Sequence, residues 1–305
     1  MKECLKFYIN GEWVDPETPK TLDVIDPSTE EPCGRISMGS RVDAEKAIKA
    51  ARAAFPSYSQ TSKEERIALL EKIIEAYNGR VKEMAETISM EMGAPAWFAK
   101  AAQAPSGAAH FSTALQILKD YDFDAPLGKT MVTREPVGVC GFITPWNWPI
   151  NQIACKVAPA LAAGCTMVLK PSEVAPLDAI ILAEILHEAG VPKGVFNLVN
   201  GDGPEVGQVL ASHPEIDLVS FTGSTRAGIL VSKAAADTVK RVALELGGKS
   251  ANIILEDADI EKFVAAGVQA CMMNSGQSCN APTRMFVPEA SQDKAIEVAK
   301  ATAEG

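Results

Sequence analysis

The chain has 305 residues, of which 47% are hydrophobic and 22% are charged, and its formal net charge is −10. This length allows about two domains that each bury a core, and the composition is that of an ordinary globular protein. The acidic balance argues against nucleic acid or an anionic membrane as the main partner. No stretch reaches the roughly 20 apolar residues that cross a bilayer, and the N-terminus lacks a signal-peptide core. We therefore expect a cytoplasmic protein.

Neither the seven cysteines nor the three histidines form a metal-type pattern. No two cysteines have the CxxC spacing, and His110, His187 and His213 lie far apart in unrelated contexts. The sequence therefore predicts reduced thiols, no metal site and no Ser-His-Asp triad.

The first 136 residues predict a hairpin followed by helices. FYINGEWVD reads as two short strands joined by the turn Asn10-Gly11. Asp43 is expected to cap a helix that runs toward Phe55. Apolar residues spaced by three and four over residues 67–88 predict two consecutive helices, because Asn78-Gly79 interrupts the run. The polar, turn-rich residues 119–136 predict an excursion or hairpin that would suit a subunit interface.

From Val137 onward, short apolar strands alternate with helical segments. Strands are expected in VGVCGFI, TMVLK, VFNLV, DLVSFT and RVALEL. This alternation predicts an α/β fold, with a parallel sheet covered by helices and a ligand crevice at the carboxyl ends of the strands. After Gly247-Gly248 a new unit begins, with a strand in ANIIL, a helix from Asp259 through Met273, a strand in TRMFV and a final helix.

Two glycine-rich turns are candidates for phosphate binding. GDGPEVG (201–207) has one residue too many before its third glycine to match a dinucleotide fingerprint. In FTGSTRAG (221–228), a strand ends at a glycine, and Ser224 and Thr225 open a helix whose N–H groups would favour a pyrophosphate. Plain N-capping by Ser224 explains the same residues.

Three further segments place reactive side chains next to strand ends. In LKPSE, Lys170 suits a ribose or phosphate, and Glu173 suits ribose hydroxyls while repelling a 2′-phosphate; a solvated turn is the alternative. In TPWNWP, the Asn147 amide suits an oxyanion hole, although a simple turn with packed indole rings fits too. Glu245 in LELGGKS suits a catalytic base, and an ordinary surface carboxylate is the alternative. Cys279 in GQSC suits a nucleophile, and a buried thiol is the alternative.

Taken together and in this order, TPWNWP, LKPSE, FTGST, LELGGKS and GQSC resemble the aldehyde dehydrogenase superfamily. The resemblance extends from the FYINGEWVD arm to the last residues. It implies a Rossmann-like cofactor domain formed by residues 1–117 and 137–248, a bridging and oligomerisation hairpin at 118–136, and part of a second α/β catalytic domain at 249–305. A full-length form would be a homo-oligomer.

The resemblance also implies the chemistry. Cys279 would attack an aldehyde to give a thiohemiacetal and then a thioester, Asn147 would hold the oxyanion, and Glu245 would activate the hydrolytic water. Lys156 matches a lysine sometimes assigned a relay role, although a lysine on a helix is ordinarily solvated. Trp148 would line the aldehyde tunnel or pack in the core. NAD is expected in preference to NADP because of Glu173. The other cofactor contacts implied by the resemblance are Thr144, Pro145, Trp146, Lys170, Ser172, Gly203, Gly223, Ser224, Thr225, Gly228 and Leu246.

Members of this superfamily are longer than this chain, so the resemblance predicts a fragment with little activity by itself. Two other classes of function remain open beside the dehydrogenase: a dinucleotide-binding remnant without catalysis, and a thiol hydrolase or esterase that uses Cys279 alone.

Overall fold

The computed structural model describes residues Met1–Gly305, which divide into two compact units, Met1–Glu245 and Leu246–Gly305. The first unit is built on a seven-stranded sheet, and the second on a two-stranded sheet with two helices. The expected α/β fold is confirmed. The finer division into cofactor domain, bridging hairpin and partial catalytic domain stays a prediction. None of the helices combines the length and apolar character needed to cross a membrane.

The large sheet has the strand order β12-β11-β8-β9-β10-β2-β3. Strands β11, β8, β9 and β10 are parallel neighbours, whereas β10, β2 and β3 pair antiparallel. From β8 the chain moves outward through β9 and β10, and then returns to place β11 on the other side of β8. This reversal of strand order lies between β8 and its two neighbours, so a ligand crevice is expected at their carboxyl ends. The strands are β2 (Phe7–Ile9), β3 (Glu12–Val14), β8 (Val139–Ile143), β9 (Thr166–Lys170), β10 (Phe196–Leu198), β11 (Leu218–Gly223) and β12 (Arg241–Leu246).

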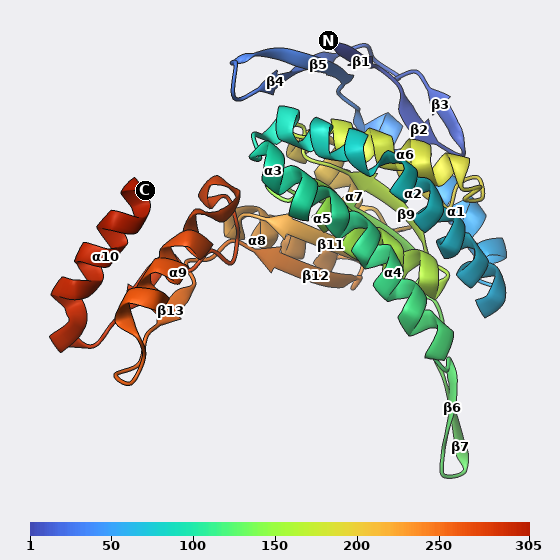
Figure 1. Ribbon diagram of the computed structural model, residues 1–305. Coiled ribbons are helices and arrows are strands. Elements are labelled where there is room, and N and C mark those ends of the chain that lie inside the picture. The colour runs from blue at the N-terminus through green and yellow to red at the C-terminus, as the bar shows by residue number, and fades with distance from the viewer. The chain divides into compact units, whose positions relative to one another are not determined.

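Helices pack around this sheet in two groups (Figure 1). Helices α2, α4, α5 and α6 pack against one another and enclose the main apolar core, in which Tyr77, Phe111 and Ile150 are fully buried. Helices α1, α7 and α8 form the other group, with α1 against β9 and α8 against β11. The helices of the unit are α1 (Arg41–Tyr58), α2 (Lys63–Met92), α3 (Ala96–Phe98), α4 (Ala104–Asp120), α5 (Pro149–Ala163), α6 (Leu177–Glu188), α7 (Gln208–Ser212) and α8 (Thr225–Ala236), with π-helical turns at Ala99–Gln103 and Gly203–Gly207.

Two smaller sheets complete the first unit. Strands β1 (Lys2–Cys4), β5 (Glu31–Ser37) and β4 (Thr21–Asp26) form one, and the hairpin β6 (Asp124–Leu127) and β7 (Thr130–Thr133) forms the other. The hairpin extends away from the end of α4 (Figure 1), and its Leu127 and Met131 are exposed. The predicted hairpin in residues 119–136 is therefore confirmed, and so is the Asn10-Gly11 turn between β2 and β3.

Two details of the helical region differ from the sequence prediction. Helix α1 is capped by Ser40, and Asp43 is the third helical residue, whose carboxylate bonds back to the Ser40 N–H in a capping box. Helix α2 runs unbroken through Asn78-Gly79. Both residues are exposed, and a methyl group at Gly79 would meet no atom, so the pair costs helix propensity without disturbing packing.

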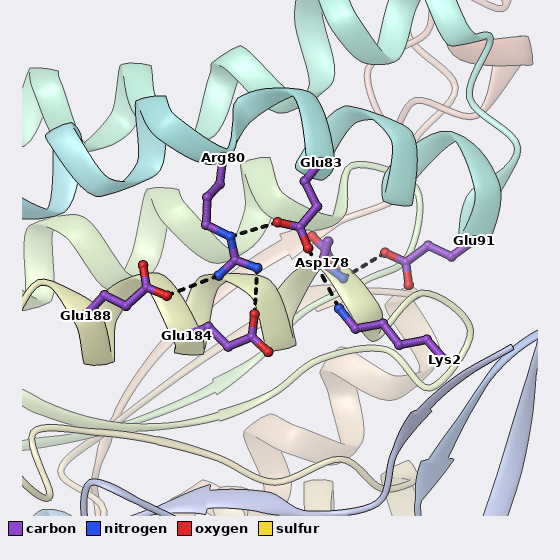
Figure 2. A network of polar contacts seen from close by, with 7 residues as sticks. All are labelled: Lys2, Arg80, Glu83, Glu91, Asp178, Glu184 and Glu188. Carbon is purple, nitrogen blue, oxygen red and sulfur yellow. Dashed lines mark hydrogen bonds and ion pairs between the residues drawn. The ribbon is translucent and has the colours of Figure 1, made fainter.

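Charged side chains join α2 to α6 (Figure 2). The Arg80 guanidinium on α2 contacts Glu184 at 2.6 Å and Glu83 at 2.7 Å. Further along α2, the buried Glu91 carboxylate accepts from the backbone N–H groups of Leu177 and Asp178, at 2.6 and 2.9 Å. Glu91 thus serves as a cap for α6 that comes from another helix, and it holds the segment after β9 against α2.

The second unit has its own small core. Strands β13 (Ala251–Ile253) and β14 (Arg284–Phe286) pair in parallel, and α9 (Ile260–Met272) packs against α10 (Gln292–Glu304). Ile254, Val264 and Ala295 are its buried residues. Short 3-10 turns occur at Met273–Gly276 and Glu289–Ser291.

Candidate functional site

The predicted segments lie at the carboxyl ends of neighbouring strands. TPWNWP follows β8, LKPSE begins in the last two residues of β9, and FTGST begins in the last three residues of β11. Strands β9 and β11 are the two that flank β8. Glu245 and Leu246 are the last residues of β12, next to β11. The reversal of strand order at β8 therefore brings together four segments at the carboxyl ends of the strands, although they are spread over about a hundred residues of sequence.

At the end of β9, a buried lysine is paired with a carboxylate. Lys170, 3% exposed, donates to Glu173 Oε2 at 3.0 Å and to the Pro171 carbonyl at 2.7 Å. Burial lowers the pKa of Lys170, and the Glu173 charge opposes this effect. Glu173 keeps 36% of its side chain exposed, so its carboxylate is both held in place and accessible. The alternative of a fully solvated LKPSE turn is wrong for Lys170. Ser172 is also buried, and its hydroxyl accepts from the Val174 N–H.

At the end of β11, the Ser224 hydroxyl accepts from the Ala227 N–H at 3.2 Å and caps α8. The N-capping interpretation of Ser224 is therefore confirmed. Thr225 is the first residue of the helix, and Gly228 is buried within it. Capping uses one N–H of the first turn, and the remaining donors and the positive end of the dipole still favour an anion there.

A cavity of about 540 Å³ lies beside this helix. Its walls come from the ends of β8 and β11, from the first turns of α8 and from the 203–208 segment, and they include Ile143, Gly203, Phe221 and Leu230. A methyl group added at Gly203 would meet no atom, so this glycine leaves space for a ligand. Nearby at the end of β8, the Thr144 hydroxyl is buried without a hydrogen-bond partner. An apolar cleft beside the first turns of a helix, with an orphaned hydroxyl on the residue that follows Ile143, fits a dinucleotide.

After β8, the chain turns at Pro145 and Trp146 and enters α5 through Asn147, Trp148 and Pro149. The Asn147 carbonyl accepts from Gln103 Nε2 at 3.1 Å, which ties this turn to the buried π-helical segment before α4. The Trp148 ring packs edge-on against Phe98, with 5.4 Å between centroids. The backbone that carries the Asn147 amide is thus held by contacts from a different part of the chain.

Lys156, in the second turn of α5, is only 7% exposed. Its ammonium group donates to Thr222 Oγ1 on β11 at 2.8 Å. Burial lowers its pKa, while Cys155 and Glu245 act in the opposite direction. The expectation of an ordinary solvated lysine is therefore wrong. Lys156 is buried beside Thr222 near the carboxyl end of β11, and the Glu245 carboxylate is close enough to interact with it electrostatically.

Cys279 belongs to the second unit and is exposed. The alternative of a buried thiol is thus wrong. A short distance before Cys279 in the chain, the three consecutive residues Asn274, Ser275 and Gly276 have φ values of 55°, 57° and 75°. This left-handed stretch is held by reciprocal hydrogen bonds between Asn274 and Gln277, at 3.3 and 3.1 Å. Within the same unit, the Cys279 carbonyl lies against Gly248, where an added methyl group would be 3.4 Å away. The GQSC thiol is therefore presented on a structured loop.

Four polar side chains near Lys156 were not predicted to have a role: Thr222, Gln152, Asn151 and His110. In the structure these side chains are joined to Lys156 by hydrogen bonds. The available signal was the cluster of polar residues in the first two turns of an otherwise apolar helix.

Comparison with known proteins places these features in a family. The sequence profile of the aldehyde dehydrogenase family matches residues 13–305. A 3-succinoylsemialdehyde-pyridine dehydrogenase from a Pseudomonas species is 60% identical over 301 residues, which are 98% of this chain and 63% of that protein. The chain thus spans less than two thirds of this relative's length.

Solved structures agree with the sequence relatives. An aldehyde dehydrogenase from Bartonella henselae superposes with a TM-score of 0.97 at 56% identity, over 100% of this chain and 64% of that one. A mutant of aldehyde dehydrogenase C from Pseudomonas syringae, in complex with NAD+ and octanal, has a TM-score of 0.97 at 51% identity, over 99% of this chain and 62% of that one.

Proposed function

Because the chain belongs to the aldehyde dehydrogenase family, we propose that it oxidises an aldehyde to a carboxylic acid with NAD as the hydride acceptor. The observation that carries this proposal is the convergence on one sheet edge of the Asn147 segment, buried Lys156 and Glu245, beside a cleft suited to a dinucleotide. The NAD+ present in the Pseudomonas syringae structure supports the choice of cofactor.

Of the residues proposed to hold the cofactor, Gly203 lines this cleft, and the others belong to the segments at the ends of β8, β9, β11 and β12. Glu173 would accept from ribose hydroxyls, while Lys170 orients it through their 3.0 Å ion pair. The first turn of α8, with Gly223, Ser224, Thr225 and Gly228, would face the pyrophosphate. Contacts from the strand ends would come from Thr144, Pro145, Trp146, Ser172, Gly203 and Leu246. When bound, NAD supplies an acceptor for the hydride that leaves the substrate carbon.

The remaining steps are assigned to the chain's own side chains. The Cys279 sulfur attacks the aldehyde carbon, and the oxyanion formed is held by the Asn147 amide and the Cys279 N–H; losing one such donor costs about 3 kcal/mol of transition-state stabilisation. Loss of hydride leaves a thioester on Cys279. Glu245 then takes a proton from water, which attacks the thioester and releases the carboxylic acid and the thiolate. The positive charge of Lys156 would favour the ionised form of Glu245.

The names of two relatives indicate the range of substrates. The Pseudomonas relative is named for a pyridine that carries a succinoyl semialdehyde, and the Pseudomonas syringae enzyme was crystallised with octanal. We propose aldehydes of this length, with a chain or ring beyond the reacting carbon, as substrates here.

The test is NADH formation at 340 nm with octanal and NAD. Cys279→Ser should abolish turnover and leave NAD binding, measured by titration calorimetry, unchanged. Cys271→Ser, in the same unit, is the matched control and should keep turnover. Retained turnover in Cys279→Ser would refute the assignment of the nucleophile. NAD binding without turnover would indicate a dinucleotide-binding remnant. Ester cleavage in the absence of NAD, with no aldehyde oxidation, would indicate a thiol hydrolase.

A further inference from the structure

Helix α6 begins without a cap of its own. Its N-cap residue is Pro176, whose side chain cannot accept from the backbone N–H groups of the first turn. The acceptor comes from α2 instead. The Glu91 side chain, 1% exposed, accepts from the Leu177 N–H on Oε2 at 2.6 Å and from the Asp178 N–H on Oε1 at 2.9 Å (Figure 2). Because both carboxylate oxygens are engaged by consecutive residues, they fix the first turn of α6 against α2.

The segment that leads into this turn carries Glu173, four residues before Leu177. Only residues 171–176 separate β9 from α6. At the β9 end, the Lys170 carbonyl accepts from the Thr144 N–H at 3.1 Å, which ties the segment to the sheet. At the other end, the tie is the cap from Glu91. A segment this short, held at both ends, has few conformations open to it.

The contacts within the segment hold Glu173 from one side only. Its Oε2 atom accepts from Lys170 at 3.0 Å, and 36% of its side chain is exposed. Without the Glu91 carboxylate, two N–H groups of α6 would be left buried and unpaired, a cost that is relieved if the first turn moves toward water. Such a movement would carry the backbone of Glu173 with it, and a binding group has to be held to within about 0.5 Å of its productive position.

Building on the proposed function, in which Glu173 accepts from the ribose hydroxyls of NAD, we infer that Glu91 is a positioning residue for the cofactor. By capping α6 from α2, it holds Glu173 in the place where the ribose binds. Glu91 itself is buried, so it acts through the backbone of α6 rather than by touching NAD.

The experiment is a double-mutant cycle, with the Kd of NAD and of NADP measured by titration calorimetry. Glu91→Ala should raise the Kd of NAD by about tenfold and that of NADP less, because Glu173 repels the 2′-phosphate instead of binding it. In a Glu173→Ala background, Glu91→Ala should change the Kd of NAD by less than about twofold, since the carboxylate that it positions is gone. A purely structural role would lower Tm equally in both backgrounds and leave the ratio of the two Kd values unchanged.

Two further variants serve as comparisons. Glu184→Gln weakens the 2.6 Å contact from Arg80, which joins the same two helices at the eighth residue of α6. It should leave both Kd values within about twofold of wild type, because it does not touch the start of the helix. Glu91→Gln keeps the size of the side chain and one accepting oxygen, so we expect a smaller rise in the Kd of NAD. It supplies the same cycle if Glu91→Ala does not fold.

The outcomes separate the two proposals. If the unsubstituted chain did not bind NAD, or if Glu173→Ala left NAD affinity unchanged, the proposed cofactor site would be contradicted and the positioning role with it. If Glu173→Ala weakened NAD binding while Glu91→Ala and Glu91→Gln did not, the positioning role alone would be overturned. An equal effect of Glu91→Ala in both backgrounds would overturn it too, because Glu91 would then not act through Glu173.

Discussion

Lys156 on α5 and Thr222 on β11 are 66 residues apart, yet the ammonium group of the first donates to the hydroxyl of the second at 2.8 Å in a buried setting. This bond satisfies a cation that burial would otherwise penalise, and it links the end of β11 to the helix that follows β8.

Thr222→Val should therefore destabilise the first unit, because it leaves the Lys156 ammonium without this acceptor in an almost inaccessible position. We expect the free energy of unfolding in urea to fall by about 1–3 kcal/mol. Thr222→Ser keeps the hydroxyl and is the matched variant, with a smaller loss. Equal stability of the valine and serine variants would show that the hydrogen bond contributes nothing.

The buried pair Glu91 and Asp178 (Figure 2) predicts a dependence of stability on pH. Burial raises the pKa of Asp178 to about 8, well above the usual range of an aspartate, and burial, then the neighbouring Asp178, raise the pKa of Glu91. When the pKa of an acid is higher in the folded state than in the unfolded state, the acid stabilises the folded state. This contribution is fully present below the pKa of the unfolded state, where the acid is protonated in both states. That contribution is lost as pH rises toward the folded pKa, here between about pH 4 and 8.

Asp178→Asn should remove much of this dependence. Wild type loses stability over this range and the asparagine variant does not, so relative to wild type its free energy of unfolding should rise by about 1–3 kcal/mol between pH 5 and pH 8. This is a reduced share of the full shift at about 1.36 kcal/mol per pKa unit. Denaturant unfolding at the two pH values measures the change. Asp122→Asn, at an exposed position, should show no such trend. If Asp122→Asn changed the pH dependence of the free energy of unfolding as much as Asp178→Asn does, Asp178 would not be the source of that dependence.

Two glycines in helices should respond in opposite ways to alanine. A methyl group at Gly107 of α4 would lie 2.2 Å from the Tyr77 hydroxyl oxygen, and this buried ring is held by a 2.8 Å bond to the Ala104 carbonyl. We expect Gly107→Ala to lower the free energy of unfolding by about 1–3 kcal/mol. Gly79→Ala in α2 meets no atom and should stabilise by about 0.5–1 kcal/mol. Thermal or urea unfolding tests both, and a stabilised Gly107→Ala would contradict the predicted clash.

Glu173 should decide between the two nicotinamide cofactors. Its carboxylate, held by Lys170, would repel a 2′-phosphate, so Glu173→Gln should narrow the preference for NAD over NADP by about tenfold. Titration calorimetry of each cofactor measures this without relying on turnover. Glu215→Gln, an exposed carboxylate elsewhere in the unit, is the control. An unchanged ratio in Glu173→Gln would remove Glu173 from the cofactor site.

Local patterns were enough to predict many elements. The Asn10-Gly11 turn, the strands from β8 to β12 and the hairpin in 119–136 all follow from residue types whose preferences act over a few positions. Where local preference competed with packing, it was a poor guide. Asn78-Gly79 reads as an interruption, but α2 continues through it because apolar residues on both sides are buried in one core.

The order of motifs along the chain was sufficient by itself to indicate the family, the candidate nucleophile and the cofactor class, since each depends on which residues are present. The tertiary structure alone determined which side chains lose water and which ones they meet. Lys156 is buried against Thr222, Glu91 caps a helix 86 residues away, and the side chains of Gln152 and Asn151 connect Thr222 to His110. Burial and hydrogen-bond direction depend on neighbours brought together by the sheet, and no pattern within a short stretch of sequence specifies them.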